Sequence, residues 1–198
     1  MTENLLPAPP ALTDDDLSDL RARLAAAAQR DGLLDVAYRT LASPIGDLLL
    51  AATEEGLVRV AFAIEGQEPV LAELAERVSP RVLAAPKRLD AVAREIDEYF
   101  AGSRTRFELP LDLRLASGFR REVILRLPDI GYGRTFTYAQ MAAAAGSPRA
   151  VRAVGTACAH NPLPIVLPCH RVVRSDGSFG GYRGGPEAKH ALLTMEAA

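Results

Sequence analysis

Residues 164–172 read Pro-Ile-Val-Leu-Pro-Cys-His-Arg-Val, and they place one of the two cysteines of the chain directly beside a histidine. Each proline fixes its own φ at about −65° and lacks a backbone N–H, so Pro164 and Pro168 predict a stiff loop rather than a helix or a central strand. The apolar residues 165–167 predict that this loop packs against a core. We therefore expect Cys169 to lie on a constrained, pre-positioned turn.

The reactivity of Cys169 depends on its neighbours. A free cysteine has a pKa of about 8.5 and is mostly a thiol at neutral pH, but a nearby base or positive charge shifts it toward the nucleophilic thiolate. His170 and Arg171 are candidates for these two roles. A packing role is the alternative, because free cysteine is often buried and adjacent side chains can point in opposite directions. The pair by itself leaves both interpretations open.

The composition is that of an ordinary globular protein. The chain has 198 residues, 48% hydrophobic and 24% charged, which fits one large domain or two small ones. It has no run of about 18 apolar residues that would span a membrane, and residues 1–7 do not resemble a signal peptide, so we expect a cytoplasmic protein. Two cysteines are too few for a disulfide framework or an all-cysteine zinc site. We expect free thiols, no metal site, and a packing role for Cys158.

The charges are unevenly distributed. Residues 117–198 hold ten Lys/Arg and five Asp/Glu, whereas residues 1–116 hold 13 Lys/Arg and 20 Asp/Glu. The net charge of −2 therefore hides a basic C-terminal part, in which nine of the ten cations are arginine. Such a part is suited to binding a polyanion with one face, although a solvated surface can carry as much charge.

The N-terminal half contains an extension and a small domain. Residues 1–33 are the expected extension, with a helix over 13–30 that Thr13 caps and Asp31-Gly32 ends. Residues 34–110 predict an α/β domain, in which three strand-like runs separated by turn sequences indicate an antiparallel meander. The strands are expected at 34–41, 47–53 and 57–64, and helices at 67–78 and 87–101. Residues 111–116 are the expected linker, within an extended crossing over 104–116.

The C-terminal domain, 117–198, is expected to be mostly helical. Its helices are predicted at 117–127, 137–145, 148–159 and 186–196. The tight turn at 146–148 between two short helices gives the outline of a helix-turn-helix, and Asp176-Gly177 predicts a hairpin turn. The sequence thus predicts an α+β fold: a small α/β domain with an antiparallel sheet, then a helical, winged-helix-like domain.

Several motifs of the C-terminal domain occur together. They are the helix-turn-helix segment 137–152, Asn161-Pro162, Pro168-Cys169-His170-Arg171-Val172 and Gly181-Tyr182-Arg183-Gly184-Gly185. From about Phe119 to Glu196, this part closely resembles the C-terminal domain of the O6-alkylguanine-DNA alkyltransferases, also called methylated-DNA–protein-cysteine methyltransferases. Residues 34–110 match the N-terminal domain of that family only in layout.

The resemblance implies an alkyl transfer that needs no cofactor. Cys169 would be the nucleophile that takes the alkyl group from O6 of guanine, and from O4 of thymine, once per molecule. His170 would act as base through a bridging water, and Glu196 would orient it if the last helix is well docked. Tyr138 would donate a proton or hydrogen bond to the departing guanine. Asn161 matches the buried asparagine that joins the recognition helix to the active-site loop.

The resemblance also implies that a monomer binds double-stranded DNA containing O6-alkylguanine through the minor groove and flips the damaged base out. Arg152 matches the arginine that fills the space left by the base, although an arginine on a basic helix also suits a phosphate contact. Arg120, Ser147 and Ser175 fall at DNA-contact positions, and the small Ala150 lets a helix approach a groove closely.

The chain departs from the family in several places. The resemblance also implies a pocket that receives the flipped base. Ile124 stands where the family commonly has tryptophan, and we expect a packing change there. The residues of the zinc site and the metal-binding sensor domain of some members are absent, and the helix at 13–30 lies outside the resemblance. The residues expected to line the pocket are Tyr138, Val172, Gly181, Tyr182 and Arg183.

Three other functions fit parts of the pattern. A non-catalytic binder of alkylated DNA, of the alkyltransferase-like type, would lack the nucleophilic cysteine, so Cys169 argues against it. A helix-turn-helix transcription factor would prefer one operator sequence and ignore alkylation. A cysteine hydrolase using Cys169, His170 and Glu196 would turn over many ester molecules.

Overall fold

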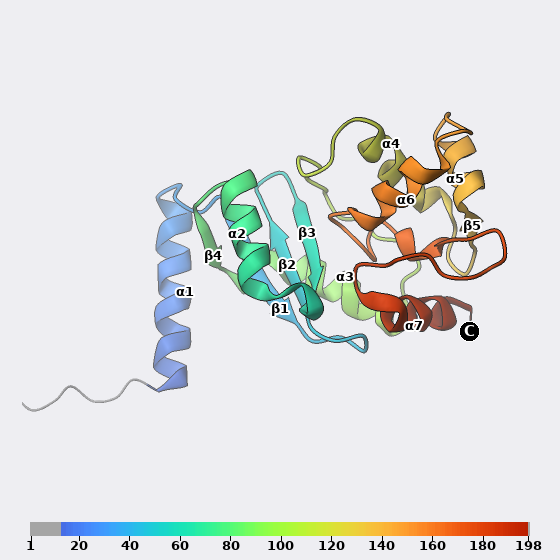
Figure 1. Cartoon of the computed structure of the whole chain (residues 1–198). Coiled ribbons are helices and arrows are strands. Elements are labelled where there is room, and N and C mark those ends of the chain that lie inside the picture. Colours follow the sequence, from blue (N-terminus) through green and yellow to red (C-terminus); the bar gives the residue numbers. More distant parts are fainter. Residues whose placement is uncertain (1–12, 198) are drawn as a thin grey trace, which may run out of the picture.

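The structure, a computed structural model, describes residues 13–197 and has a sheet-based N-terminal half and a mostly helical C-terminal half (Figure 1). The sheet has the strand order β3-β2-β1-β4. β2 pairs antiparallel with both β1 and β3, which confirms the predicted meander. The strands are β1 (Val36–Leu41), β2 (Leu48–Ala52), β3 (Leu57–Phe62) and β4 (Val82–Ala84).

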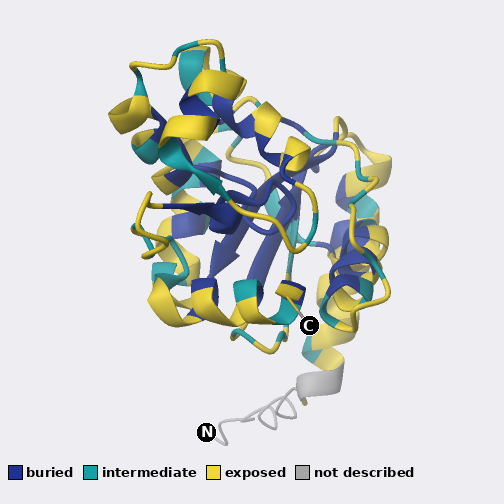
Figure 2. Ribbon diagram, turned by 90° about the vertical axis from the view of Figure 1, so that its right-hand side faces the viewer, coloured by how far each residue is buried: buried dark blue, intermediate teal, exposed yellow. Residues whose placement is uncertain are grey.

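The sheet is buried on both faces. Successive side chains of a strand point to opposite faces, so β2 and β3 each supply two apolar surfaces. Leu49 and Leu74 belong to the cluster between the sheet and α2 (Gln67–Arg77), whereas Leu50 and Ile96 belong to the cluster that includes α3 (Asp90–Phe100). Figure 2 shows the strands buried among helices whose outer sides are exposed.

The β4 strand was not predicted. It pairs in parallel with β1 at the edge of the sheet, over three residue pairs. A segment of three residues is too short to show an alternating pattern, so tertiary pairing rather than local sequence decides its conformation.

The predicted N-terminal helix forms as α1 (Asp14–Arg30). Thr13 caps it through a capping box with Asp16. Its buried side includes Ala25 and Ala28, and it packs next to β4. It therefore lies at the far end of the sheet from the C-terminal half (Figure 1).

The C-terminal half is built around a helix-turn-helix. Before this helix pair, Ile124 of α4 (Gly118–Arg126) is fully buried in the core. A capping box between Thr137 and Gln140 starts the first helix of the pair. The second begins at Val151 rather than at residue 148, because residues 147–150 form a turn closed by a backbone hydrogen bond of 2.8 Å. The helices of this half are α4 (Gly118–Arg126), α5 (Tyr138–Ala144), α6 (Val151–Ala159) and α7 (Gly185–Ala197).

The predicted hairpin at Asp176-Gly177 is only partly correct. A turn forms there, with the N–H of Arg174 donating to the carbonyl of Ser178 at 2.9 Å. However, β6 (Val172–Val173) pairs in parallel with β5 (Phe136–Thr137) and not with residues 178–179. Phe179 instead packs edge-on against a histidine of α7, so the chain turns away before a second strand can form.

The two halves share one core. The N–H of Val60 in β3 donates to the carbonyl of Pro162, close in sequence to the loop that carries Cys169, at 2.9 Å. At the other end of β3 the N–H of Leu57 donates to the carbonyl of Pro110. Gly56 has a φ of 143°, and a Cβ at this position would collide with that carbonyl, so only glycine fits. A single cluster of buried apolar side chains runs through both halves.

None of the helices within residues 13–197 is long and apolar enough to cross a lipid bilayer.

Candidate active site

The loop before Cys169 is held in place by Asn161. The buried amide of Asn161 donates to the carbonyl of Leu167 at 2.7 Å and accepts from the N–H of Leu163 at 3.0 Å. Between Leu163 and Leu167, Ile165 has a φ of 74°, a left-handed conformation that β-branched residues rarely adopt. The loop therefore reaches Cys169 in one defined conformation.

Cys169 opens the short 3-10 helix η4 (Cys169–Arg171), and only 3% of its surface is exposed. Burial raises the pKa of the thiol; the Asn161 amide and the Lys189 ammonium oppose this rise without cancelling it. Arg171, the candidate for a positive charge beside the thiol, instead has its guanidinium held by the carboxylate of Glu196. The resting sulfur is a protonated thiol, so a base must remove its proton during any reaction.

His170 has the form that such a base requires. It is fully buried, and its Nε2 lies 2.8 Å from Oε1 of Glu196. Burial lowers the pKa of His170 below 6.5, although Glu196 opposes this shift. In a neutral imidazole that donates from Nε2 to a carboxylate, Nδ1 keeps a free lone pair. Nδ1 of His170 is buried and has no hydrogen-bond partner among the described residues, so it is available to accept a proton.

Glu196 lies at the centre of a network of donors. It accepts hydrogen bonds from the Tyr99 hydroxyl at 2.6 Å and from two nitrogens of Arg171 at 2.8 and 2.9 Å. Burial alone would raise the pKa of Glu196, but the hydrogen bonds from His170 and Arg171 hold it at about 2. The predicted docking of the last helix is present, and Glu196 is a buried, ionised carboxylate.

Two tyrosines lie near the sulfur. Tyr138, at the start of α5, is half-buried, and its hydroxyl packs against Gly180 so closely that a Cβ there would collide with it. The hydroxyl of Tyr182 is buried without a partner among the described residues, and its ring stands edge-on to His170. Burial raises the pKa of both hydroxyls, and the Cys169 sulfur contributes to each rise. Both hydroxyls are therefore protonated and lie within electrostatic reach of the sulfur.

The other predicted pocket residues take different positions. Val172 is buried, and its carbonyl accepts a 2.7 Å hydrogen bond from the buried Lys189. Gly181 is exposed on the loop between β6 and α7. Arg183 reaches across to the N-terminal half and forms an ion pair of 2.7 Å with Glu65. The loop that carries these residues is thus anchored on both halves.

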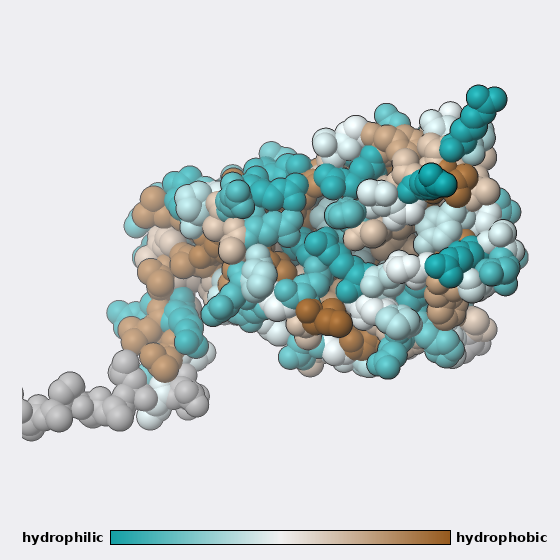
Figure 3. Space-filling view, viewed as in Figure 1, coloured by the Kyte–Doolittle hydropathy of each residue, from teal (hydrophilic) through white to brown (hydrophobic). Residues whose placement is uncertain are grey.

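The predicted DNA-contact residues lie mostly at the surface. Arg152 is exposed on α6 and forms no salt bridge with any described residue. Ser147 and Ala150 lie in the turn between α5 and α6, and Ser175 is exposed in the turn after β6. Arg120 instead donates inward, to a backbone carbonyl just before α4, at 2.9 Å. Figure 3 shows hydrophilic side chains projecting where α5 and α6 lie.

Two residues of the site were missed from the sequence. Tyr99 comes from α3 in the N-terminal half, 97 residues before Glu196, and is fully buried. Lys189 in α7 is almost fully buried, and burial lowers its pKa. Tyr99 follows Ile96 by one helical turn and so falls on the apolar stripe of its helix, which is the one sequence signal that could have identified it.

The two cysteines have different surroundings. Both are free, and Cys158 is buried in α6, where its predicted packing role is confirmed. Within residues 13–197, no three His, Cys, Asp or Glu side chains are grouped as ligands for a metal ion.

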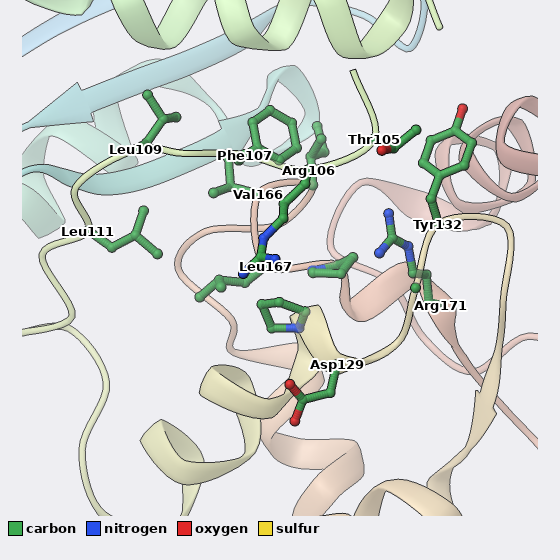
Figure 4. A pocket seen from close by; sticks show the side chains of 14 residues that line it. Thr105, Arg106, Phe107, Leu109, Leu111, Asp129, Tyr132, Val166, Leu167 and Arg171 are labelled. Atoms are coloured by element: carbon green, nitrogen blue, oxygen red, sulfur yellow. The ribbon is translucent and has the colours of Figure 1, made fainter. Parts of the chain in front are cut away.

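A cavity of about 550 Å³ lies behind the Cys169 loop (Figure 4). It is bounded by residues 165–168 on one side and by residues 105–107 of the crossing segment on the other. Arg171 and Tyr132 border it, with the guanidinium 5.7 Å from the centre of the tyrosine ring. None of the predicted substrate-pocket residues lines this cavity.

Comparison with known proteins matches both halves to one family. Residues 36–113 match the ribonuclease-like domain of 6-O-methylguanine DNA methyltransferase, and residues 118–198 match its DNA-binding domain. A methylated-DNA–protein-cysteine methyltransferase of Mycolicibacterium paratuberculosis is 40% identical over 161 residues, which cover 81% of this chain and 92% of that protein.

Comparison with solved structures leads to the same family. The O6-methylguanine methyltransferase of Mycobacterium tuberculosis is similar at a TM-score of 0.72 and 38% identity, covering 82% of this chain and 93% of that one. The same organism's OGT in complex with DNA gives a TM-score of 0.72 and 37% identity, covering 81% and 92%. The chain is therefore a member of the methylated-DNA–protein-cysteine methyltransferase family.

Proposed function

We propose that this chain repairs DNA by taking an alkyl group from O6 of guanine onto Cys169. The observation that carries the proposal is the arrangement around the sulfur. A buried thiol is followed directly by a neutral His170, whose Nε2 is held by the ionised Glu196 and whose Nδ1 is free. This arrangement lets the thiol stay protonated at rest and lose its proton only when a substrate is in place.

His170 accepts the thiol proton through Nδ1, directly or through a water, while Glu196 stabilises the resulting imidazolium. The sulfur attacks the alkyl carbon, so an S–C bond forms as the C–O6 bond breaks. The electrons of that bond return to guanine, which accepts a hydrogen bond or proton from Tyr138. Any proton that Tyr138 gives up is replaced through solvent while His170 releases the thiol proton, so both side chains end neutral. The thioether that forms has no acidic proton and is not reversed by an internal base, so each molecule acts once.

The DNA is engaged through the helix-turn-helix. We place α6 in the minor groove, because Ala150 and Gly155 add little side-chain bulk to this region and Arg152 is exposed on it. Arg152 occupies the space left when the alkylated base is flipped toward Cys169. The side chains of Cys169, His170 and Glu196 all come from one chain, so a monomer contains the reacting groups.

The runner-up is a binder of alkylated DNA that does not react. This alternative is disfavoured because such a binder lacks the nucleophilic cysteine, whereas this chain has Cys169 at that position.

The test uses a duplex that contains one O6-methylguanine, followed by peptide mapping of the protein by mass spectrometry. The proposal expects the peptide that contains Cys169 to gain the mass of one CH₂ unit, and the Cys169→Ala variant to bind the duplex without any gain. The Cys158→Ala variant is the matched control and should react like the wild type. A wild-type chain that binds the methylated duplex and remains unmodified would establish the binder instead.

A further inference from the structure

Tyr99 brings a hydroxyl from the N-terminal half into the reacting network. It lies on α3, is fully buried, and donates to Oε1 of Glu196 at 2.6 Å. The same hydroxyl lies 3.5 Å from Nε2 of His170. Burial, and then Glu196, raise the pKa of Tyr99, so its hydroxyl stays protonated and acts only as a donor here.

We propose that Tyr99 is a positioning residue for alkyl transfer, whose hydroxyl fixes the Glu196 carboxylate and thereby holds His170 with its proton on Nε2 and its Nδ1 free. This inference rests on the proposed function, in which His170 is the base. It assigns the N-terminal half a direct part in the chemistry.

The Glu196 carboxylate is oriented by several hydrogen bonds. Oε1 of Glu196 is shared by three donors from two elements: Tyr99 in α3 at 2.6 Å, and His170 and Arg171 in η4 at 2.8 and 2.9 Å. Oε2 accepts from Arg171 at 2.8 Å and from the N–H of Gly133 at 3.4 Å. The shortest of these bonds is the one from Tyr99, which is also the one donor that comes from a helix of the N-terminal half.

The Tyr99 hydroxyl also affects the charge on the Glu196 carboxylate. A carboxylate that is shared among several donors is a weaker base, so the proton between it and His170 stays on the imidazole. Without the Tyr99 hydroxyl, more negative charge would remain on Oε1, and the pKa of His170 would rise. The other charged or titratable groups that surround this pair are Arg171 in η4, Lys189 in α7, and Tyr132 and Tyr182 in the loops.

The hydroxyl and the ring of Tyr99 make separate contacts. The Tyr99 ring packs against Phe100, Phe107 and Tyr132, with ring centres 5.3 to 6.2 Å apart. The substitution Tyr99→Phe keeps these contacts and removes only the donor to Glu196. Tyr132→Phe is the matched control, because it removes a hydroxyl from the same aromatic cluster that makes no hydrogen bond to a described residue.

The experiment measures the single-turnover rate of methyl transfer from an O6-methylguanine duplex at several pH values, together with the Kd for the unmethylated duplex. We expect Tyr99→Phe to react about tenfold more slowly at neutral pH, which is a part of the ~10²–10⁴-fold that a positioned base contributes. The acid limb of its pH–rate profile should move to higher pH, while its Kd stays that of the wild type. Tyr132→Phe should match the wild type in its transfer rate, its pH–rate profile and its Kd.

Equal rates and profiles for Tyr99→Phe and the wild type would overturn the inference, as would a slower variant whose profile has not moved. If Tyr99→Phe does not fold, the ¹⁵N resonances of His170 in the wild type decide: a proton on Nε2 supports the inference, and a proton on Nδ1 overturns it. If the wild type itself transfers no methyl group, the proposed function fails, and a comparison of the His170 ¹⁵N resonances of Tyr99→Phe with those of the wild type still tests the positioning by Tyr99.

Discussion

At the scale of the residue, the chemistry depends on when Cys169 loses its proton. Its burial raises the pKa of the thiol, and the positive groups nearby do not restore the thiolate. A permanently ionised sulfur would react with any small electrophile, whereas a protonated one reacts only after His170 has taken the proton. Under the proposed function, the neutral His170 and the ionised Glu196 are therefore the pair that switches the nucleophile on.

The pH dependence of the reaction tests this division of roles. Because burial lowers the pKa of His170 below 6.5, its base form already predominates at neutral pH. The single-turnover rate should be flat through neutral pH and fall only as the pH drops through the lowered pKa of His170. A rate that instead rises steeply toward a midpoint at or above the pKa of an ordinary thiol, about 8.5, would show that the sulfur ionises without the imidazole.

The free energy of unfolding should also depend on the ionised Glu196 carboxylate. The pKa of Glu196 is about 2 in the folded chain against 4.5 when unperturbed, so its contribution to stability is complete above pH 4.5 and is lost as the pH falls toward 2. Glu196→Gln leaves the buried Arg171 without its counter-charge and should lower the free energy of unfolding by about 3–5 kcal/mol at neutral pH. Urea unfolding measures this loss.

The control for that experiment is Glu122→Gln, an exposed glutamate on α4 that forms no salt bridge with a described residue. It should change the free energy of unfolding by no more than about 0.5 kcal/mol. Similar values for the two variants would contradict the buried network.

At the scale of the element, the start of α5 and the loop before α7 fit together at Tyr138. The Tyr138 hydroxyl lies where a Cβ of residue 180 would be, so the loop closes over it only because that residue is glycine. Gly180→Ala should displace Tyr138 or the loop and slow methyl transfer by tenfold or more, on the order of the loss from one misplaced catalytic donor. Gly131→Ala, whose added methyl has no neighbour closer than 3.9 Å, should react normally. Equal single-turnover rates for the two variants would mean that Tyr138 has no part in the reaction.

The helix-turn-helix contains Arg152, which we expect to take part in flipping the damaged base. Arg152→Ala should retain the reaction with free O6-methylguanine base but lose most of the reaction with duplex DNA, because only the duplex requires the base to be flipped. Arg149→Ala, which removes a neighbouring exposed arginine, should weaken DNA binding without changing the ratio of the two reactions. Equal losses on both substrates for Arg152→Ala would show that it does not take part in flipping.

The elements also show how far a sequence can be interpreted. Capped, periodic segments such as 14–30 and 138–144 were predicted because Thr13 and Thr137 each supply a local start signal. The Pro-Cys-His-Arg-Val loop was predicted because prolines and motif spacing are local too. The β4 strand and the Tyr99–Glu196 contact were missed, because pairing at a sheet edge and a hydrogen bond across 97 residues are decided by tertiary packing.

At the scale of the whole molecule, the sulfur belongs to the core that joins the two halves. Only 3% of Cys169 is exposed, so an added methyl group must displace well-packed neighbours. Methylation should therefore lower the free energy of unfolding by about 1–3 kcal/mol, the usual cost of overpacking a core. Denaturant unfolding of protein before and after reaction with a methylated duplex measures this, with protein exposed to unmethylated duplex as control. Unchanged stability would mean that the methyl group occupies an open pocket.

The most direct test of the account is the number and place of methyl groups transferred when methylated duplex is in large excess. If Cys169 is the acceptor and His170 only removes its proton, each protein molecule should restore one guanine and then stop, with one methyl group on Cys169. Restoration of several guanines per molecule with Cys169 unmodified, or a methyl group found on any other residue, would contradict it.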